Sequence, residues 1–189
     1  ARVTLFAAVC GLQDARGRSR FGVGERPVTE LCRPGRVVRK SGGLLDDFGQ
    51  DWAPAPGGGG RMAEPGHCFE WAWLFARLAR SGVPHAVAVS DAMTAFGRRH
   101  GIDARRGVAI NEVLSDGSVV NGKARLWPQT ERLKVAVVRY HRTGSDEDLC
   151  EIVDAWKGLR TYFLPEAPSL WRDTLNEAGR FNGGVVPGS

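Results

Sequence analysis

Apolar residues recur at helical spacing in four stretches of the chain, and this pattern predicts two pairs of helices. The first pair is predicted at residues 67–80 and 84–100, with a glycine shortly after each helix. The second pair is predicted at residues 129–142 and 145–163. The apolar positions expected on the last helix are Leu149, Ile152, Val153, Trp156, Leu159 and Phe163.

Short apolar runs after each helix pair predict β-hairpins. Residues 113–114 and 119–120 flank Asp116-Gly117, which is a typical hairpin turn. An apolar run at 171–175 precedes a second turn at 176–179. Both parts of the chain therefore follow one plan, in which a hairpin comes after two helices.

A constant spacing relates the two parts. Glu131 follows Glu70 by 61 residues, Gly144 follows Gly82 by 62, and the glycines of the two hairpin turns are also 62 residues apart. Repeated helix pairs bury their apolar faces against neighbouring units, so the pattern predicts an all-α fold, an α/α toroid with short hairpins between helix pairs. If the first helix of each unit lines the inside of such a ring, Glu70, Glu131 and His67 lie at one mouth of it.

The distribution of charge separates the N-terminus from the rest of the chain. Residues 1–40 hold nine lysines and arginines against three acidic residues, while the whole chain has a net charge of +5, so the remainder is close to neutral. Glycine and proline also interrupt every candidate helix before Leu44. We therefore predict an irregular basic segment at residues 1–43 and a folded part at residues 44–189.

Composition argues against several classes of partner. The basic segment has no base-reading motif, so no nucleic acid is expected to bind. No apolar run approaches the ~20 residues of a membrane span, and the first residues do not resemble a signal peptide, which favours a cytoplasmic protein with no membrane partner. The four cysteines are scattered without metal-ligand spacing, and neither a metal nor another cofactor is predicted.

Residues 64–73 (EPGHCFEWAW) hold the strongest candidates for chemistry. Proline and glycine place His67 at the start of a helix, and Glu70 and Trp71 share its face. The positive end of the helix dipole favours a neutral imidazole, which can accept a proton while a nearby carboxylate orients it. A tryptophan beside it suits a sugar ring. A helix cap followed by a core helix explains the same residues equally well.

Four motifs occur in order along the chain: RMAEPGHCFEWAWL at 61–74, DGS at 116–118, LWPQTERLK at 126–134 and LWRD at 170–173. They resemble the N-acylglucosamine 2-epimerase superfamily, and most closely its mannose isomerase and aldose–ketose isomerase branch. The resemblance runs from about Leu44 to Ser189. It implies an (α/α)6 barrel, of which this chain holds about half, and metal-free proton transfer next to a sugar carbonyl.

The resemblance also implies the roles of individual residues. His67 matches a catalytic acid/base histidine, Glu70 a carboxylate one turn later, and Glu131 a glutamate that contacts substrate or assists catalysis. We predict a mannose–fructose type isomerase acting on a monosaccharide, in which His67 moves the proton between C2 and C1 and Glu70 orients His67. The predicted substrate-binding residues are Trp71, Trp127, Gln129, Trp171 and Arg61.

Three alternatives remain open at this stage. The proton can return to the other face of C2, which is 2-epimerisation of an N-acylated or cellobiose-type sugar. Glu70 and Glu131 can serve as the acid and base of a glycoside hydrolase. The chain can also be an inactive half-barrel, because the family's second catalytic histidine lies beyond Ser189. Open apolar edges would then favour self-association into a homo-oligomer. The sequence does not decide which sugar binds or whether it is phosphorylated.

Overall fold

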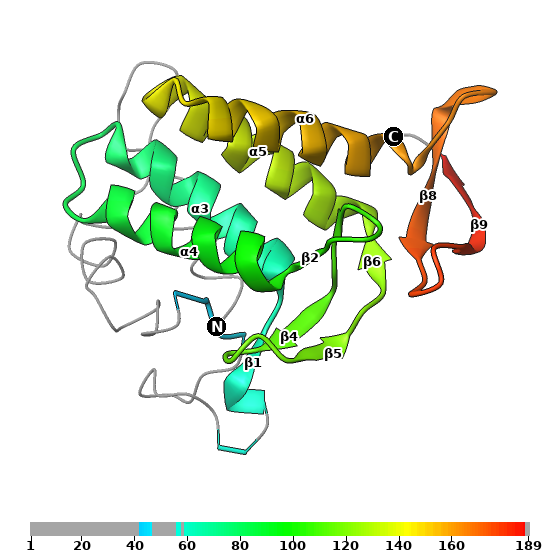
Figure 1. Cartoon of the computed structure of the whole chain (residues 1–189), viewed down its shortest axis with the longest axis horizontal. Helices are drawn as coiled ribbons and strands as arrows, with labels where there is room; N and C mark the ends of the chain where they lie inside the picture. Colours follow the sequence, from blue (N-terminus) through cyan, green and yellow to red (C-terminus); the bar gives the residue numbers. More distant parts are fainter. Residues whose placement is uncertain (1–41, 47–55, 58, 188–189) are drawn as a thin grey trace.

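The computed structural model describes residues 42–46, 56–57 and 59–187, and a first helix pair begins shortly after residue 59. A short 3-10 helix, η1 (Gly59–Arg61), and strand β1 (Met62–Ala63) lead into α3 (Pro65–Ala79) and then α4 (Ala86–His100). Figure 1 shows α3 and α4 side by side. The strands that follow are β2 (Ile102–Asp103), β3 (Val108–Ala109), β4 (Glu112–Leu114) and β5 (Val119–Asn121).

A second helix pair repeats this order. Strand β6 (Ala124–Arg125) leads into α5 (Leu126–Thr143), and α6 (Asp146–Arg160) follows after a tight turn. The chain then forms an antiparallel group of strands at one end of the molecule (Figure 1). These are β7 (Phe163–Leu164), β8 (Ala167–Leu175) and β9 (Phe181–Pro187).

The strands of the two units pair in the same way. In the first unit β1 pairs with β4, which places Ala63 opposite Val113, and β4 pairs with β5. In the second unit β6 pairs with β8, which places Ala124 opposite Leu175, and β8 pairs with β9. All these pairings are antiparallel. Each unit therefore ties the strand before its first helix to the hairpin after its second helix.

The turn glycines confirm that the two units are a repeat. Gly82 and Gly144, at the two interhelical turns, both have positive φ angles, of 79° and 63°. Gly117 and Gly179, at the two hairpin turns, have φ angles of 89° and 80°. Side chains with a Cβ disfavour this region, so the predicted spacing of 62 residues corresponds to a repeated backbone conformation.

The core lies around α3, which contacts α4 on one side and α5 on the other. Gly97 of α4 lets the helices approach closely, because a Cβ there would lie 2.7 Å from the ring of Phe69. The Ser90 hydroxyl also donates a hydrogen bond to the Ala72 carbonyl at 2.7 Å. The large buried side chains of α3 and α4 are Phe69, Trp71, Leu74, Phe75, Leu78, Met93 and Phe96.

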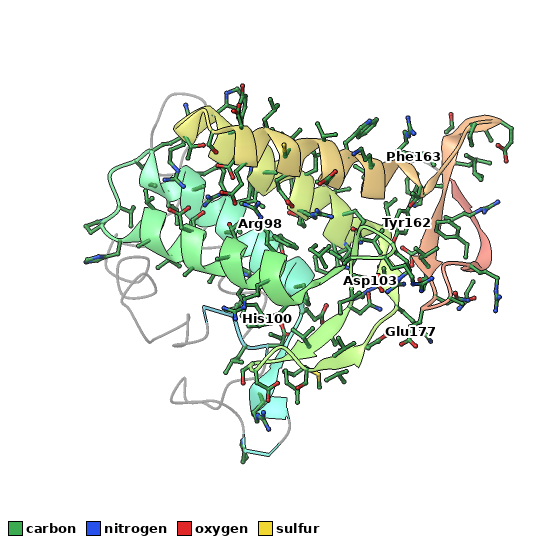
Figure 2. The ribbon with its side chains drawn as sticks, viewed as in Figure 1. Arg98, His100, Asp103, Tyr162, Phe163 and Glu177 are labelled. Carbon is green, nitrogen blue, oxygen red and sulfur yellow. The ribbon has the colours of Figure 1, made fainter. Side chains whose placement is uncertain are left out.

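The contact between α4 and α6 is ionic rather than apolar. Arg98 of α4 lies 3.0 Å from Glu147, 3.5 Å from Asp148 and 3.5 Å from Glu151 (Figure 2). Asp148 is almost completely buried and also accepts a hydrogen bond from Arg139 of α5 at 3.1 Å. Buried carboxylates require such partners, so this network fixes how the second pair sits against the first.

Several sequence predictions need correction. The description "all-α" is too narrow, because short antiparallel sheets join the helices. Helix α5 begins at Leu126, so Pro128 lies inside its first turn, where a backbone N–H has no helical partner to lose. Helix α6 ends at Arg160, and Phe163 belongs to β7. Its predicted apolar positions Leu149 and Val153 are exposed, as is Trp156.

Two further expectations concern the ends of the chain and membranes. The irregular segment predicted at residues 1–43 lies outside the described residues except for Gly42 and Gly43. Among the described helices, none combines the length and the hydropathy needed to cross a membrane.

Candidate active site

His67 lies in the first turn of α3, where Pro65 and Gly66 begin the helix. Gly66 is required there because a Cβ would lie 2.5 Å from the Trp127 ring. The Nδ1 atom of His67 lies 2.7 Å from Asp46 Oδ1. Since a carboxylate accepts hydrogen bonds, Nδ1 carries the proton and donates it. The other ring nitrogen, Nε2, is left for chemistry, and the side chain is 23% exposed.

The surroundings of His67 favour its charged form. Burial lowers the pKa of His67, but the hydrogen bond to Asp46 and the charges of Asp46, Glu64 and Glu70 outweigh burial and raise the pKa overall. The helix dipole had predicted the opposite direction. The orienting carboxylate is also Asp46, which precedes the helix, whereas Glu70 had been predicted for this task.

A guanidinium and an indole complete one side of this cluster. Glu64 Oε2 lies 3.9 Å from His67 Nδ1 and accepts a hydrogen bond from Arg125 at 2.9 Å. Arg125 also donates to Asn111 Oδ1 at 3.3 Å, and its guanidinium lies 5.4 Å from the Trp127 ring centroid. The ring centroids of Trp127 and His67 are 5.2 Å apart. The predicted platform residue Trp127 is therefore in contact with the imidazole.

Two glutamates on neighbouring helices form the other side of the cluster. Burial raises the pKa of Glu70, and the charge of Glu131 raises it further, while His67 and Lys134 act in the opposite direction. Lys134 Nζ lies 2.5 Å from Glu131 Oε2 and 4.4 Å from the centroid of the Trp73 ring. The equivalent positions Glu70 and Glu131 are thus electrostatically coupled, as expected if both first helices line one wall.

Two of the predicted binding residues are committed to the interior. Trp71 is 9% exposed, with its ring 5.9 Å from that of Phe75. Gln129 is fully buried, and its amide exchanges hydrogen bonds with the backbone N–H and carbonyl of Ala109 at 2.7 and 2.8 Å. Neither side chain presents a free polar edge to a ligand.

The other two predicted binding residues lie on strands and turns away from this cluster's contacts. The Arg61 guanidinium lies 2.5 Å from Asp116, in the turn between β4 and β5. Trp171 lies on β8, opposite Phe163 of β7 in the strand register. Among the described contacts, neither joins the group around His67.

Four site residues were missed by the sequence analysis: Asp46, Arg125, Lys134 and Trp73. Three of them follow from the repeat, because a spacing of 61 residues relates Glu64 to Arg125 and Trp73 to Lys134. Asp46 has no such signal, since it reaches His67 only through the fold.

The cluster also has the composition of a cation site. One ligand atom each from Asp46, Glu64 and His67 lies within 4.8 Å of the others. Two of these groups are already engaged, because His67 Nδ1 donates to Asp46 and Glu64 pairs with Arg125. The guanidinium supplies the positive charge that a metal would bring. Cys68 next to His67 is fully buried, and burial raises the pKa of its thiol to about 12.

The chain matches the model of one protein family, N-acylglucosamine 2-epimerase (GlcNAc 2-epimerase), over residues 1–189. It is 38% identical over 191 residues to a mannose-6-phosphate isomerase of Rhizobium meliloti, covering 98% of this chain and 49% of the relative. Both matches include most or all of the first 43 residues, which the sequence analysis had set apart from the resemblance. The chain spans about half the length of this relative.

Solved structures share the fold. A D-mannose isomerase superposes with a TM-score of 0.72 and 17% sequence identity, covering 85% of this chain and 44% of that structure. A cellobiose 2-epimerase from Bacillus thermoamylovorans superposes with a TM-score of 0.71 and 17% identity, covering 86% of this chain and 41% of that structure. The architecture of the two units is therefore found in larger sugar-converting proteins.

Proposed function

The chain belongs to the N-acylglucosamine 2-epimerase family, and on this premise we propose that it carries the proton-transfer part of a sugar aldose–ketose isomerase of the mannose–fructose type. One observation carries the proposal. The imidazole of His67 is held through Nδ1 by Asp46 at 2.7 Å, which directs Nε2 to the partly open side of the cluster. A histidine with a fixed tautomer suits repeated uptake and return of one proton.

The reaction that fits this geometry passes through an enediol. His67 takes the proton from C2 of the aldose while the C1 carbonyl oxygen gains a proton. The C2 hydroxyl then loses its proton as the C2 carbonyl forms, and His67 returns a proton to C1. Glu70 is suited to the oxygen side of these steps, because its raised pKa keeps a larger share of its carboxyl protonated near neutral pH.

The remaining side chains of the cluster suit binding. Trp127 offers an indole beside the imidazole, and a sugar ring can stack on such a surface. Glu131, held by Lys134, can accept hydrogen bonds from sugar hydroxyls. We assign the platform to Trp127 rather than to Trp71, since Trp71 is enclosed in the core.

The two units correspond to part of a larger ring in this proposal. The matched structures are more than twice as long as the superposed region, and further site residues would come from the rest of an (α/α)6 barrel. The proposed substrate is a monosaccharide, and the name of the Rhizobium meliloti relative makes a 6-phosphate worth testing. A cytoplasmic location also stays a proposal.

The test is proton exchange in deuterated water, followed by NMR with mannose, fructose and their 6-phosphates. Isomerisation places deuterium on C1 of the ketose, whereas 2-epimerisation places it on C2 of an epimer without forming ketose. We expect the first pattern from the 189-residue chain, and its loss by at least about 100-fold in His67→Asn. A longer family member with the equivalent substitution is the parallel assay. Exchange that survives removal of the imidazole in both proteins contradicts the proposal.

A further inference from the structure

Helix α6 carries an apolar face that the described structure leaves open. Leu149, Val153 and Trp156 are 42%, 45% and 47% exposed, and their spacing of four and three residues places them on one side of the helix. In α4, the equivalent helix of the first unit, Val87 at 39% is the large apolar side chain with comparable exposure. A row of three large half-exposed side chains is a typical contact surface.

This apolar row lies on the side of α6 away from the first unit. The opposite side of α6 carries Glu147 and Glu151, which pair with Arg98 of α4. Figure 1 draws α6 along the edge of the molecule, with α5 on its inner side and no described helix beyond it. The row is therefore accessible along the full length of α6.

The two ends of the row carry opposite charges. Asp146 begins α6 and Arg160 ends it, and both are exposed. Within the described part of the chain, neither has an ion-pair partner. Each lies seven residues from Val153, or about 10 Å along the helix axis. The helix dipole favours this arrangement, but it leaves one charge of each sign available beside the apolar row.

We propose that this face binds a second copy of the chain, with the two α6 helices antiparallel about a two-fold axis at Val153. A two-fold contact requires a surface that is complementary to itself. Antiparallel pairing centred on Val153 places that residue opposite its own copy and Asp146 opposite Arg160 of the other chain. Leu149 then meets the region of Trp156. The apolar row and both charges are satisfied at once.

The contact uses α6 and none of the residues proposed for proton transfer. It therefore stands or fails independently of the sugar chemistry. The oligomeric state is measured directly on the 189-residue chain, by sedimentation velocity over a range of concentrations. We expect a reversible monomer–dimer equilibrium.

Substitution of Val153 tests the surface. Val153→Glu places two carboxylates opposite each other at the two-fold axis, and we expect the dissociation constant to rise by more than about tenfold. The matched control is Val119→Glu, which adds the same charge at a 60% exposed valine of β5. We expect the control to leave the equilibrium unchanged. Circular dichroism checks that both variants keep their helices.

Charge exchange tests the antiparallel register. Asp146→Arg and Arg160→Asp should each weaken the dimer, and the double variant should restore it, because the two positions face each other only in antiparallel pairs. A cysteine at position 153, in a Cys150→Ser background, should form an oxidised dimer efficiently. A strictly monomeric chain, a dimer insensitive to Val153→Glu, or single charge variants without effect would each overturn the proposal.

Discussion

The two helix-pair units share a backbone plan but contribute different chemistry. The first provides the imidazole of His67 and its nearby carboxylates, and the second provides cations. Three pairs of positions related by 61 residues interact across the boundary: Glu64 with Arg125, Glu70 with Glu131, and Trp73 with Lys134. The candidate site is therefore made at the junction of the repeats, and neither unit holds it alone.

The outer helices differ as well. Helix α4 buries Met93 and Phe96 against α3, whereas α6 leaves Val153 and Trp156 exposed. A repeat thus conserves the direction of its helices without conserving what covers them. The same backbone unit can end in a core contact or in an open surface.

The largest expected effect concerns the first unit's proton carrier. Asp46→Asn removes the charge that raises the pKa of His67, so burial then dominates and the pKa falls. If neutral His67 is the base, the acid limb of the pH–rate profile moves to lower pH. Loss of orientation should also reduce kcat by about 10- to 100-fold. Glu64→Gln is the control, with a smaller shift in the same direction; an unshifted limb in Asp46→Asn would separate His67 from the base.

A stability comparison of equivalent glycines tests the repeat itself. Gly117 and Gly179 share a positive φ, so alanine should cost each turn about 1–2 kcal/mol. At Gly117 a Cβ would also lie 2.1 Å from His100 Nδ1, while space is open at Gly179. We expect Gly117→Ala to be the more destabilising by about 1 kcal/mol or more in urea unfolding. Equal costs would mean that His100 yields without strain.

The smallest effect should appear at the charges of the second unit. Lys134 lowers the pKa of Glu70 and Glu131 raises it. Lys134→Met should therefore move the alkaline limb, where protonated Glu70 is lost, to higher pH, and Glu131→Gln should move it to lower pH. Rates at neutral pH should change only a few-fold for Lys134→Met. Shifts in the same direction would show that this limb does not report Glu70.

Local patterns predicted the helix pairs and the repeat because they depend on periodicity and turn glycines. The interhelical turns at Gly82 and Gly144 are examples, since a positive φ demands glycine at both. Asp46 was not predictable, because no spacing relates it to His67. The exposure of Val153 was missed for a related reason: helical periodicity identifies an apolar face but not the element that covers it.

Arg61 and Gln129 show a further limit of motif reasoning. Both lie within motifs that resemble the family, yet one pairs with Asp116 at a turn and the other supports the backbone of Ala109. A motif residue can serve the scaffold as readily as a ligand. Contacts between side chains distinguish the two cases, and the sequence does not contain them.

The burial of Cys68 has a practical consequence. A thiol with a pKa of about 12 is almost entirely uncharged at neutral pH, and alkylating reagents react with the thiolate. Cys150 is exposed on α6. A maleimide fluorophore should therefore label α6 while sparing the helix that bears His67, which makes Cys150 an optical reporter on this outer helix.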